Sequence, residues 1–125
     1  MKKATTGTRK SGVQREYFRD GKLASVGAYR NGQKSGVWKY YLRTGGLRAT
    51  GRYSNGQLVG LWKWYRENGW PLQVGGFNDG KQAGLWKRYH RTGELYDVGK
   101  FTAGKKTGVW KIYSPAGKLT RTKNY

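Results

Sequence analysis

The chain alternates short runs of aromatic, aliphatic and β-branched residues with short runs of Gly and polar residues, and this pattern restarts every 24 residues. Within one unit, Val37–Arg43 and Leu47–Tyr53 are the two runs with the composition of β-strands. No window keeps a helical period, and each of the 21 Gly residues would cost a helix about 1 kcal/mol relative to Ala. The pattern therefore predicts two strands in every unit and no helix.

The units stay in phase because certain residues recur at fixed positions, counted here from the Gly that opens each unit. Trp stands third in four units, a cation fourth, Tyr sixth and Gly tenth, and Tyr or Phe stands eighteenth. The five repeats are residues 12–35, 36–59, 60–83, 84–107 and 108–125. They predict one repeat domain over 12–125, and the basic residues 1–11 before it predict a flexible arm or an edge strand.

Turn-forming dipeptides separate the predicted strands. Asn31-Gly32, Asn55-Gly56 and Asp79-Gly80 stand between repeats, and Asn-Gly and Asp-Gly are strong signals for a hairpin. We therefore expect an all-β protein, a single-layer twisted antiparallel β-meander of about ten strands built from five β-hairpins. In the third repeat, Trp70-Pro71-Leu72 is expected to shift a strand start, because Pro cannot donate to a ladder.

A two-residue turn at the tenth position would set the register inside each hairpin. It would place Trp38 opposite Gly51, Trp62 opposite Gly75 and Trp86 opposite Gly99, with each indole over the glycine across from it. The same register puts Trp, the Leu of position twelve and the Tyr or Phe of position eighteen on one face. Val or Leu of position two, Lys of position four and Tyr of position six then share the other face, and a one-residue bulge would exchange these assignments.

The recurring Gly and aromatic residues resemble the MORN repeat family in its bacterial variant form. The matching core is Gly-x-Tyr/Phe-x-x-Gly-x-x-x-Gly-x-Trp, seen for example between Gly51 and Trp62, and the likeness covers residues 12–125. The resemblance implies a curled single-layer antiparallel sheet that serves as an interaction module. Members are tied to membranes or lipid head groups, accompany catalytic domains or carry an antitoxin label, and the resemblance transfers no catalytic residue.

Charge is the second strong feature of the sequence. The 26 Lys and Arg residues against 6 Asp and Glu give a net charge of +20, which indicates an anionic partner more than it indicates a fold. Cys is absent, so disulfides and thiolate metal sites are excluded. The basic start has no apolar run of a secretory signal behind it, and we expect a cytoplasmic protein.

Cations and tyrosines form a ladder along the repeats, because positions four and six lie on one face of a strand. The tyrosines could equally pack across the strands, with the Lys stems lying over them. The candidate anion-binding residues are Arg15, Lys39, Lys63, Lys87 and Lys111, with Arg88, Arg91, Lys100, Lys105 and Lys106 around them. The candidate aromatic contacts are Tyr41, Tyr65, Tyr89, Tyr113, Trp64 and Trp70.

Catalytic chemistry has little support in the sequence. The one histidine, His90, has no carboxylate at a suggestive spacing, and Asp20 and Asp79 occupy turn positions. We therefore expect no catalytic residue, no metal site, no cofactor and no small-molecule substrate.

The sequence predicts a non-catalytic repeat protein that binds an anionic macromolecule through a basic, aromatic-rich sheet surface, with nucleic acid as the favoured partner. The alternative is an antitoxin-like, immunity-like or inhibitor protein that neutralises an acidic protein, with Trp64 and Trp70 as anchors. Binding to an anionic membrane surface ranks third, because no amphipathic helix or lipidation signal assists it. Oligomers could also form through the edges of the sheet.

Overall fold

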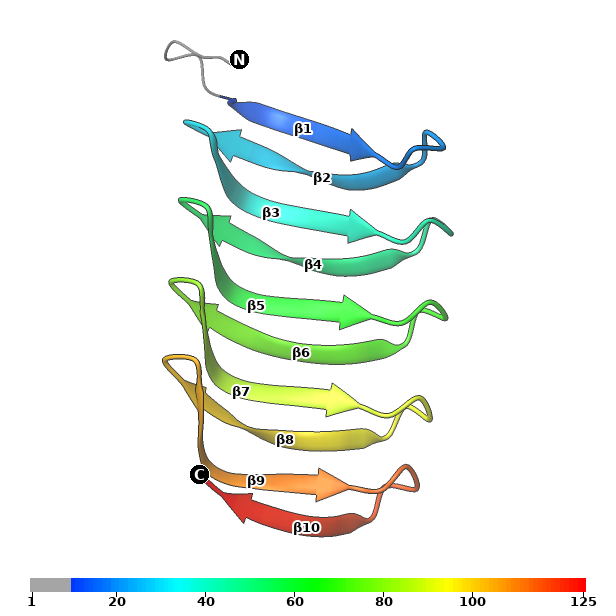
Figure 1. Cartoon of the computed structure of the whole chain (residues 1–125), viewed down its shortest axis with the longest axis vertical. Coiled ribbons are helices and arrows are strands. Elements are labelled where there is room, and N and C mark those ends of the chain that lie inside the picture. Colours follow the sequence, from blue (N-terminus) through cyan, green and yellow to red (C-terminus); the bar gives the residue numbers. More distant parts are fainter. Residues whose placement is uncertain (1–9) are drawn as a thin grey trace.

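The computed structural model describes residues 10–125 as one ten-stranded antiparallel sheet, with the strands in sequence order (Figure 1). The strands are β1 (Gly12–Tyr17), β2 (Leu23–Arg30), β3 (Gln33–Tyr41), β4 (Leu47–Ser54), β5 (Gln57–Tyr65), β6 (Pro71–Asn78), β7 (Lys81–Tyr89), β8 (Leu95–Thr102), β9 (Lys105–Tyr113) and β10 (Leu119–Asn124). The described residues contain no helix, so the predicted all-β meander is confirmed. Of the predicted arm 1–11, residues 1–9 lie outside the described part of the chain.

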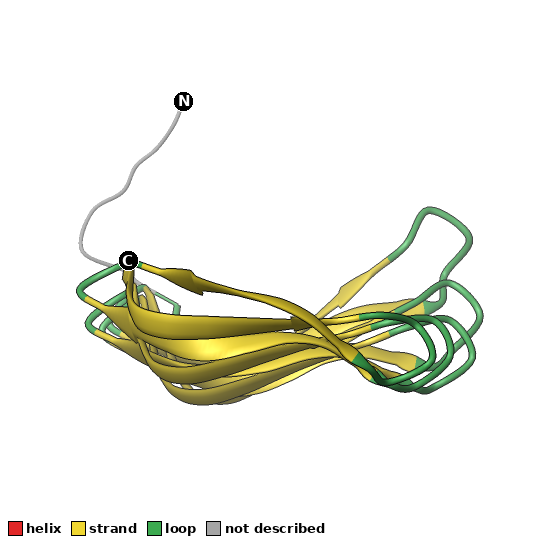
Figure 2. Ribbon diagram, turned by 90° about the horizontal axis from the view of Figure 1, so that it is seen from below, coloured by secondary structure: helices red, strands yellow, loops and turns green. Residues whose placement is uncertain are grey.

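The first strand of each hairpin starts earlier than the sequence predicted. Strand β3 begins at Gln33, because Gly36 bends the strand without ending it. The glycines at this position adopt φ values of 67° to 82°, which L side chains rarely adopt. Val26 pairs with Lys39 and Ala28 with Ser35, so three residues of β3 stand opposite Gly27 alone. This repeated bend curves the sheet into the shallow trough seen end-on in Figure 2.

The turns between repeats have the predicted geometry. Asn31, Asn55 and Asp79 have φ values of 48° to 51°, and the glycine after each has a φ of 80° to 83°. Positive φ at both central residues defines a type I′ turn, whose twist suits a hairpin. Ala103 takes the same conformation, with a φ of 51°, without the side-chain oxygen that makes it tolerable for Asn and Asp.

The turns inside the repeats are longer than the predicted two residues. The Leu42 N–H donates to the Gly46 carbonyl, and the Gly45 N–H donates to the Leu42 carbonyl. A register shift beside Tyr41 offsets the extra loop residue. The predicted partners are therefore confirmed despite the wrong turn. They are Trp38 with Gly51, Trp62 with Gly75, and Trp86 with Gly99.

Each indole covers a different glycine from the one predicted. A Cβ built on Gly99 would lie 2.1 Å from the ring of Trp110, and the ring of Trp86 covers Gly75. The indole therefore leans over the preceding repeat, not over its own hairpin partner. The same direction is seen in the hydrogen bonds, since Trp86 Nε1 donates to the Gly76 carbonyl at 2.9 Å. Each tryptophan thus joins its repeat to the one before it.

The bulge also moves the Leu of position twelve to the other face. Leu47 stands directly opposite Tyr41, so it shares a face with Tyr41 and Lys39 and lies away from Trp38. Pro71 stands opposite Tyr65 in the same way, and β6 begins at the position where the other second strands begin. The predicted shift at Trp70-Pro71-Leu72 is therefore wrong.

The core is a single row of aromatic rings on one face of the sheet, which we call the tryptophan face. Trp38, Trp62, Trp86 and Trp110 are at most 4% exposed. Their rings alternate with those of Tyr29, Tyr53, Phe77, Phe101 and Tyr125 in edge-to-face contacts. Such pairs contribute about 0.5–1.5 kcal/mol each beyond their buried area. The aromatic row therefore stabilises a sheet that has no second layer among the described residues.

Candidate anion-binding surfaces

The cations of position four form one straight row, and we call the side of the sheet that carries them the lysine face. Arg15, on the edge strand β1, stands opposite Val26, and each of the other four cations stands opposite a Val or Thr on both neighbouring strands. The row of cross-strand partners reads Arg15, Val26, Lys39, Thr50, Lys63, Val74, Lys87, Val98, Lys111 and Thr122. Cations therefore recur every second strand, about 10 Å apart.

Tyrosines and aliphatic side chains flank the cations on the same face. Tyr65 is half-buried, and it lines one shallow depression with Lys63, Leu61 and Val37. Leu61 and Val37 are 58% and 49% exposed, in contrast to the 2% exposure of Trp62, which follows Leu61 and points to the other face. The half-buried tyrosines of this face are Tyr41, Tyr65, Tyr89 and Tyr113. The lysine face thus offers parallel stripes of cations, aromatic rings and aliphatic groups to solvent.

Among residues 10–125, no Asp or Glu side chain lies on the lysine face. Glu16 and Asp97 point to the tryptophan face, where Glu16 accepts a hydrogen bond from Ser25 Oγ at 3.1 Å. The other carboxylates stand in turns, and they are Asp20, Glu67, Asp79 and Glu94. The positive potential of the lysine face is therefore not offset by any acidic neighbour on that face.

Several predicted anion-binding residues do not join this row. Arg88 belongs to the tryptophan face, where it donates to the buried Asp97 at 2.6 and 3.0 Å. This pairing raises the pKa of Arg88. Lys106 also lies on that face, with its Nζ over the rings of Trp110 and Tyr125 at 4.7 and 5.3 Å. Both cations are already occupied by contacts within the protein.

The remaining predicted cations stand outside the row. Lys100 stands opposite Leu85, on the same side of the sheet as Lys87. Lys105 is exposed at the start of β9, and Arg91 is exposed in the turn between β7 and β8. Only Lys100 therefore widens the row of position four.

The two predicted tryptophan anchors differ in exposure. Trp64 is half-buried on the tryptophan face, with ring centroids of Trp62 and Trp86 at 5.9 and 5.6 Å. Trp70 is 48% exposed and lies over the turn of the next repeat, where a Cβ on Gly93 would be 3.1 Å from its ring. The two indoles therefore do not form one anchor on the lysine face.

A polar cluster on the tryptophan face was not predicted from the sequence. Lys34 Nζ lies 4.8 Å from the ring centroid of Trp38 and donates to Tyr40 Oη at 3.1 Å. Tyr40 and Tyr53 join their hydroxyls at 2.7 Å. Burial raises the pKa of both phenols, and the bond to Tyr40 raises the pKa of Tyr53 further. The two phenols bond to each other and the lysine is held over aromatic rings, so the groups of this cluster are used in packing the fold.

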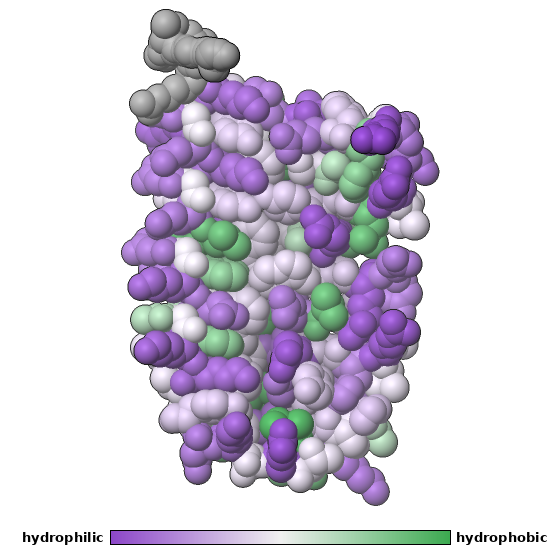
Figure 3. Space-filling view, viewed as in Figure 1, coloured by the Kyte–Doolittle hydropathy of each residue, from purple (hydrophilic) through white to green (hydrophobic). Residues whose placement is uncertain are grey.

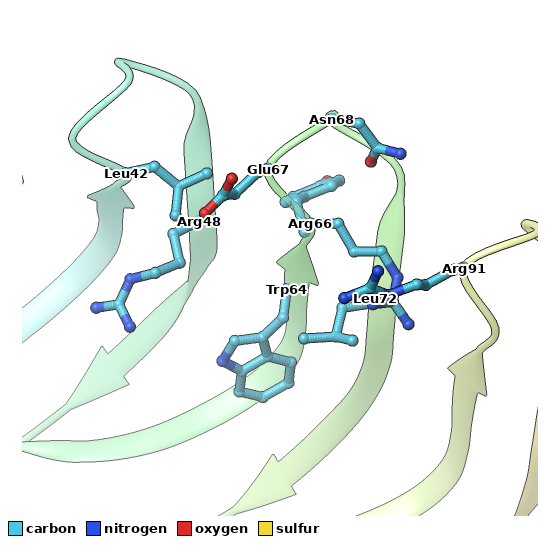
Figure 4. Close-up of a pocket in the computed structure, with 9 residues that line it drawn as sticks. Leu42, Arg48, Trp64, Arg66, Glu67, Asn68, Leu72 and Arg91 are labelled. Carbon is cyan, nitrogen blue, oxygen red and sulfur yellow. The ribbon is translucent and has the colours of Figure 1, made fainter.

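A groove of about 600 Å³ runs along the turn end of the tryptophan face. We call it the arginine groove and define it by Arg48, Arg66, Arg91, Leu42, Trp64 and Leu72. Figure 4 shows Trp64 and Leu72 directed into one hollow, with Arg48 on one side and Arg66 and Arg91 on the other. No pattern in the sequence indicated that Arg48 belongs here, because the bulge beside Tyr41 decides to which face its side chain points. Elsewhere on the face drawn in Figure 3 hydrophilic residues predominate, and apolar groups form small separate patches.

His90 has a structural position. Its Nε2 is 2.8 Å from the Tyr113 carbonyl of the next repeat, and its ring packs edge-to-face against Tyr96. Residues 10–125 contain no group of three or more His, Cys, Asp or Glu residues that could hold a metal ion. They also contain no helix long and apolar enough to span a membrane.

Comparison with known proteins adds a family. The family model described as MORN repeat variant matches residues 10–33, 58–79 and 106–125, which together exceed half of the chain. These matches include the bend glycines Gly12, Gly60 and Gly108 and the buried Trp62 and Trp110. No curated protein matches the chain.

Proposed function

Since the chain belongs to the MORN repeat family, a non-enzymatic repeat type, we propose that it is a non-catalytic binding protein whose lysine face holds nucleic acid. The observation that carries this proposal is the row of five cations across all ten strands on a face without carboxylates. The backbone of a nucleic acid is a line of regularly spaced negative charges. A row of cations at a regular interval is complementary to such a line.

The tyrosines beside the lysines support nucleic acid over other anions. Single-stranded nucleic acid binds to surfaces where cations track the backbone and aromatic rings stack on bases. A lysine reads phosphates as a point charge and carries little information about base sequence. We therefore propose binding with weak sequence preference.

A fluorescence anisotropy titration of a labelled 20-nucleotide single strand would test this function. The logarithm of the binding constant should fall linearly with the logarithm of the salt concentration. Replacing Lys39, Lys63 and Lys87 by Gln should reduce the magnitude of that slope by roughly two to three. The control with equal charge loss replaces Lys22, Lys81 and Lys118 by Gln, since all three are exposed near turns.

Two outcomes would overturn the proposal. One is no binding of the wild-type protein at low salt. The other is an equal loss of slope in the lysine-face variant and in its control, which would show that net charge alone acts. Binding of vesicles with anionic lipid, but not of the oligonucleotide, would assign the lysine face to a membrane surface instead.

A second candidate function, binding of an acidic protein in the manner of an antitoxin or inhibitor, is favoured by a different observation. The arginine groove combines apolar side chains with guanidinium groups that have no carboxylate partner among the described residues. This combination suits a protein segment better than a phosphate backbone, for the reasons developed below.

A further inference from the structure

We propose that the arginine groove is a docking site for an acidic peptide segment of a partner protein. Carboxylates of the segment meet Arg48 and Arg91, and an apolar side chain beside them packs against Trp64, Leu42 and Leu72. The groove lies at the turn end of the face opposite the lysine row, and Tyr65 is the one lining residue that it shares with the lysine face. The arginines of the site are therefore separate from the proposed nucleic-acid surface.

Three repeats build the groove. Leu42 and Arg48 come from the β3–β4 hairpin, Trp64, Arg66 and Leu72 come from the β5–β6 hairpin, and Arg91 comes from the turn after β7. Figure 4 shows the two sides of the hollow separated by the indole of Trp64. The volume of about 600 Å³ is enough for a few side chains of a bound segment.

The repeats themselves provide a comparison that points to an anionic ligand. Arg43 lies 3.7 Å from the carboxylate of Asp20 in the preceding turn. Arg91 occupies the position equivalent to Arg43 two repeats later, but the position equivalent to Asp20 holds Asn68. Arg43 is thus paired with a carboxylate of the preceding turn, whereas Arg91, at the equivalent position, faces a turn in which an amide replaces that carboxylate.

The other guanidinium groups of the groove also lack carboxylate partners. The ion pairs of the described residues are Arg43 with Asp20 and Arg88 with Asp97, so neither Arg48 nor Arg66 takes part in one. Arg66 is held in place because its Nη2 donates to the Tyr89 carbonyl at 2.8 Å, while its buried Nε has no hydrogen-bond partner. Three arginines and one carboxylate, Glu67, leave a formal charge of +2 at the groove.

The lining favours a peptide over a nucleic acid. Leu42, Leu72 and Trp64 offer an apolar wall that a polyphosphate chain cannot use, and the carboxylate of Glu67 repels a continuous run of phosphates. The ring of Trp64 is flanked by Trp62 and Trp86, so its faces are not open to a stacking base. Arginine forks bind carboxylates through two parallel hydrogen bonds, which gives direction to a short acidic segment.

The test uses two fluorescein-labelled octapeptides as probes, one alternating Glu and Leu and one containing Glu alone. We expect the alternating peptide to bind the wild-type protein, and the all-Glu peptide to bind several-fold more weakly. Replacing Arg48 and Arg91 together by Gln should weaken the alternating peptide about tenfold or more. The matched control replaces Arg30 and Arg121 by Gln, because both are exposed, Arg30 stands at the opposite end of the strands from the groove, and Arg121 belongs to β10, which supplies no groove residue.

A second measurement reports the site directly. In a ¹H–¹⁵N spectrum, the indole N–H signal of Trp64, assigned with a Trp64→Phe variant, should shift as the alternating peptide is added. The proposal is overturned if the wild-type protein does not bind this peptide at millimolar concentration. It is also overturned if the groove variant and the control weaken binding equally, or if both peptides bind with the same affinity. Oligonucleotide binding by the groove variant should match that of the control, and a selective loss there would assign the groove to nucleic acid.

Discussion

Gly51 lies directly beneath the indole of Trp62, and a Cβ built on Gly51 would come within 2.0 Å of that ring. The same contact recurs between Gly27 and Trp38, so each of these rings packs against the backbone of the preceding repeat. The sheet has one layer, so this row of rings over glycines takes the place of a core between two layers. The stability of the array should therefore depend on glycine at this position.

Gly51→Ala should destabilise the protein by about 3 kcal/mol or more, because the buried ring of Trp62 cannot move away without losing its contacts. Urea unfolding followed by tryptophan fluorescence measures the effect. Gly46→Ala is the control, since the nearest atom to its Cβ is 3.8 Å away and its φ is not in the left-handed region. Equal stability of the two variants would show that the ring of Trp62 does not exclude a side chain at position 51.

Ala103→Asn should raise the stability by about 0.5–1 kcal/mol. Ala103 has a φ of 51°, whereas the equivalent turns use Asn or Asp, whose side chains tolerate this conformation. A thermal scan should show a higher Tm for Ala103→Asn and a lower Tm for the reverse change, Asn55→Ala. A lower Tm for Ala103→Asn would mean that the β8–β9 turn departs from the type I′ geometry.

Arg88→Ala should cost about 2–3 kcal/mol, because it leaves the carboxylate of Asp97 buried without its partner. The cost stays below that of a fully buried pair because the Arg88 side chain is 46% exposed. In the second repeat, the positions equivalent to Arg88 and Asp97 hold the uncharged pair Tyr40 and Ala49. Arg88→Tyr combined with Asp97→Ala should therefore recover most of the urea midpoint that Arg88→Ala loses. Failure of this double variant would show that the ion pair contributes more than the neutral packing.

The strands, their order and their partners were predictable from the sequence because Gly and aromatic residues recur with a fixed period. The predicted hairpin register is correct although the predicted turn is wrong. The extra residue in the loop after Tyr41 is offset by the bulge beside Tyr41, so the strand partners stay the same. The direction of the indoles was not predictable from pairing alone. It depends on the register at Gly36 and its equivalents, where three residues of one strand stand opposite a single glycine of the previous repeat, here Gly27.

The lysine row was also visible in the sequence, since position four alternates with the buried Trp on either side of the strand. The arginine groove was not, because Arg48 reaches the tryptophan face only through the bulge, and Arg66 and Arg91 stand in loops. One signal could have indicated it. Asn68 replaces the acidic residue that compensates an arginine at the equivalent position of the first repeat, Asp20.

Stability should fall as the pH rises above about 10, the ordinary pKa of tyrosine. Burial raises the pKa of Tyr40 and Tyr53 in the folded protein, so the unfolded chain loses these protons first. The stability that the two neutral phenols contribute is therefore fully present below the pKa of tyrosine in the unfolded chain. It is lost as the pH rises from that value toward the pKa of these phenols in the folded protein. Urea midpoints between pH 8 and pH 11 would show this decline, and Tyr53→Phe should flatten it. Tyr17→Phe is the control, because that ring is 59% exposed, and an equal effect of both changes would contradict the prediction.

Tyr65→Leu should separate ring contacts with bases from charge contacts with phosphates on the lysine face. If the ring stacks on a base, the change should weaken single-stranded oligonucleotide binding by about 1–3 kcal/mol while the salt dependence stays the same. Tyr65→Phe keeps the ring and should bind as the wild type does. Unchanged binding by Tyr65→Leu, together with a lower urea midpoint, would assign the tyrosines to cross-strand packing beside Pro71 and leave nucleic-acid binding to the lysines alone.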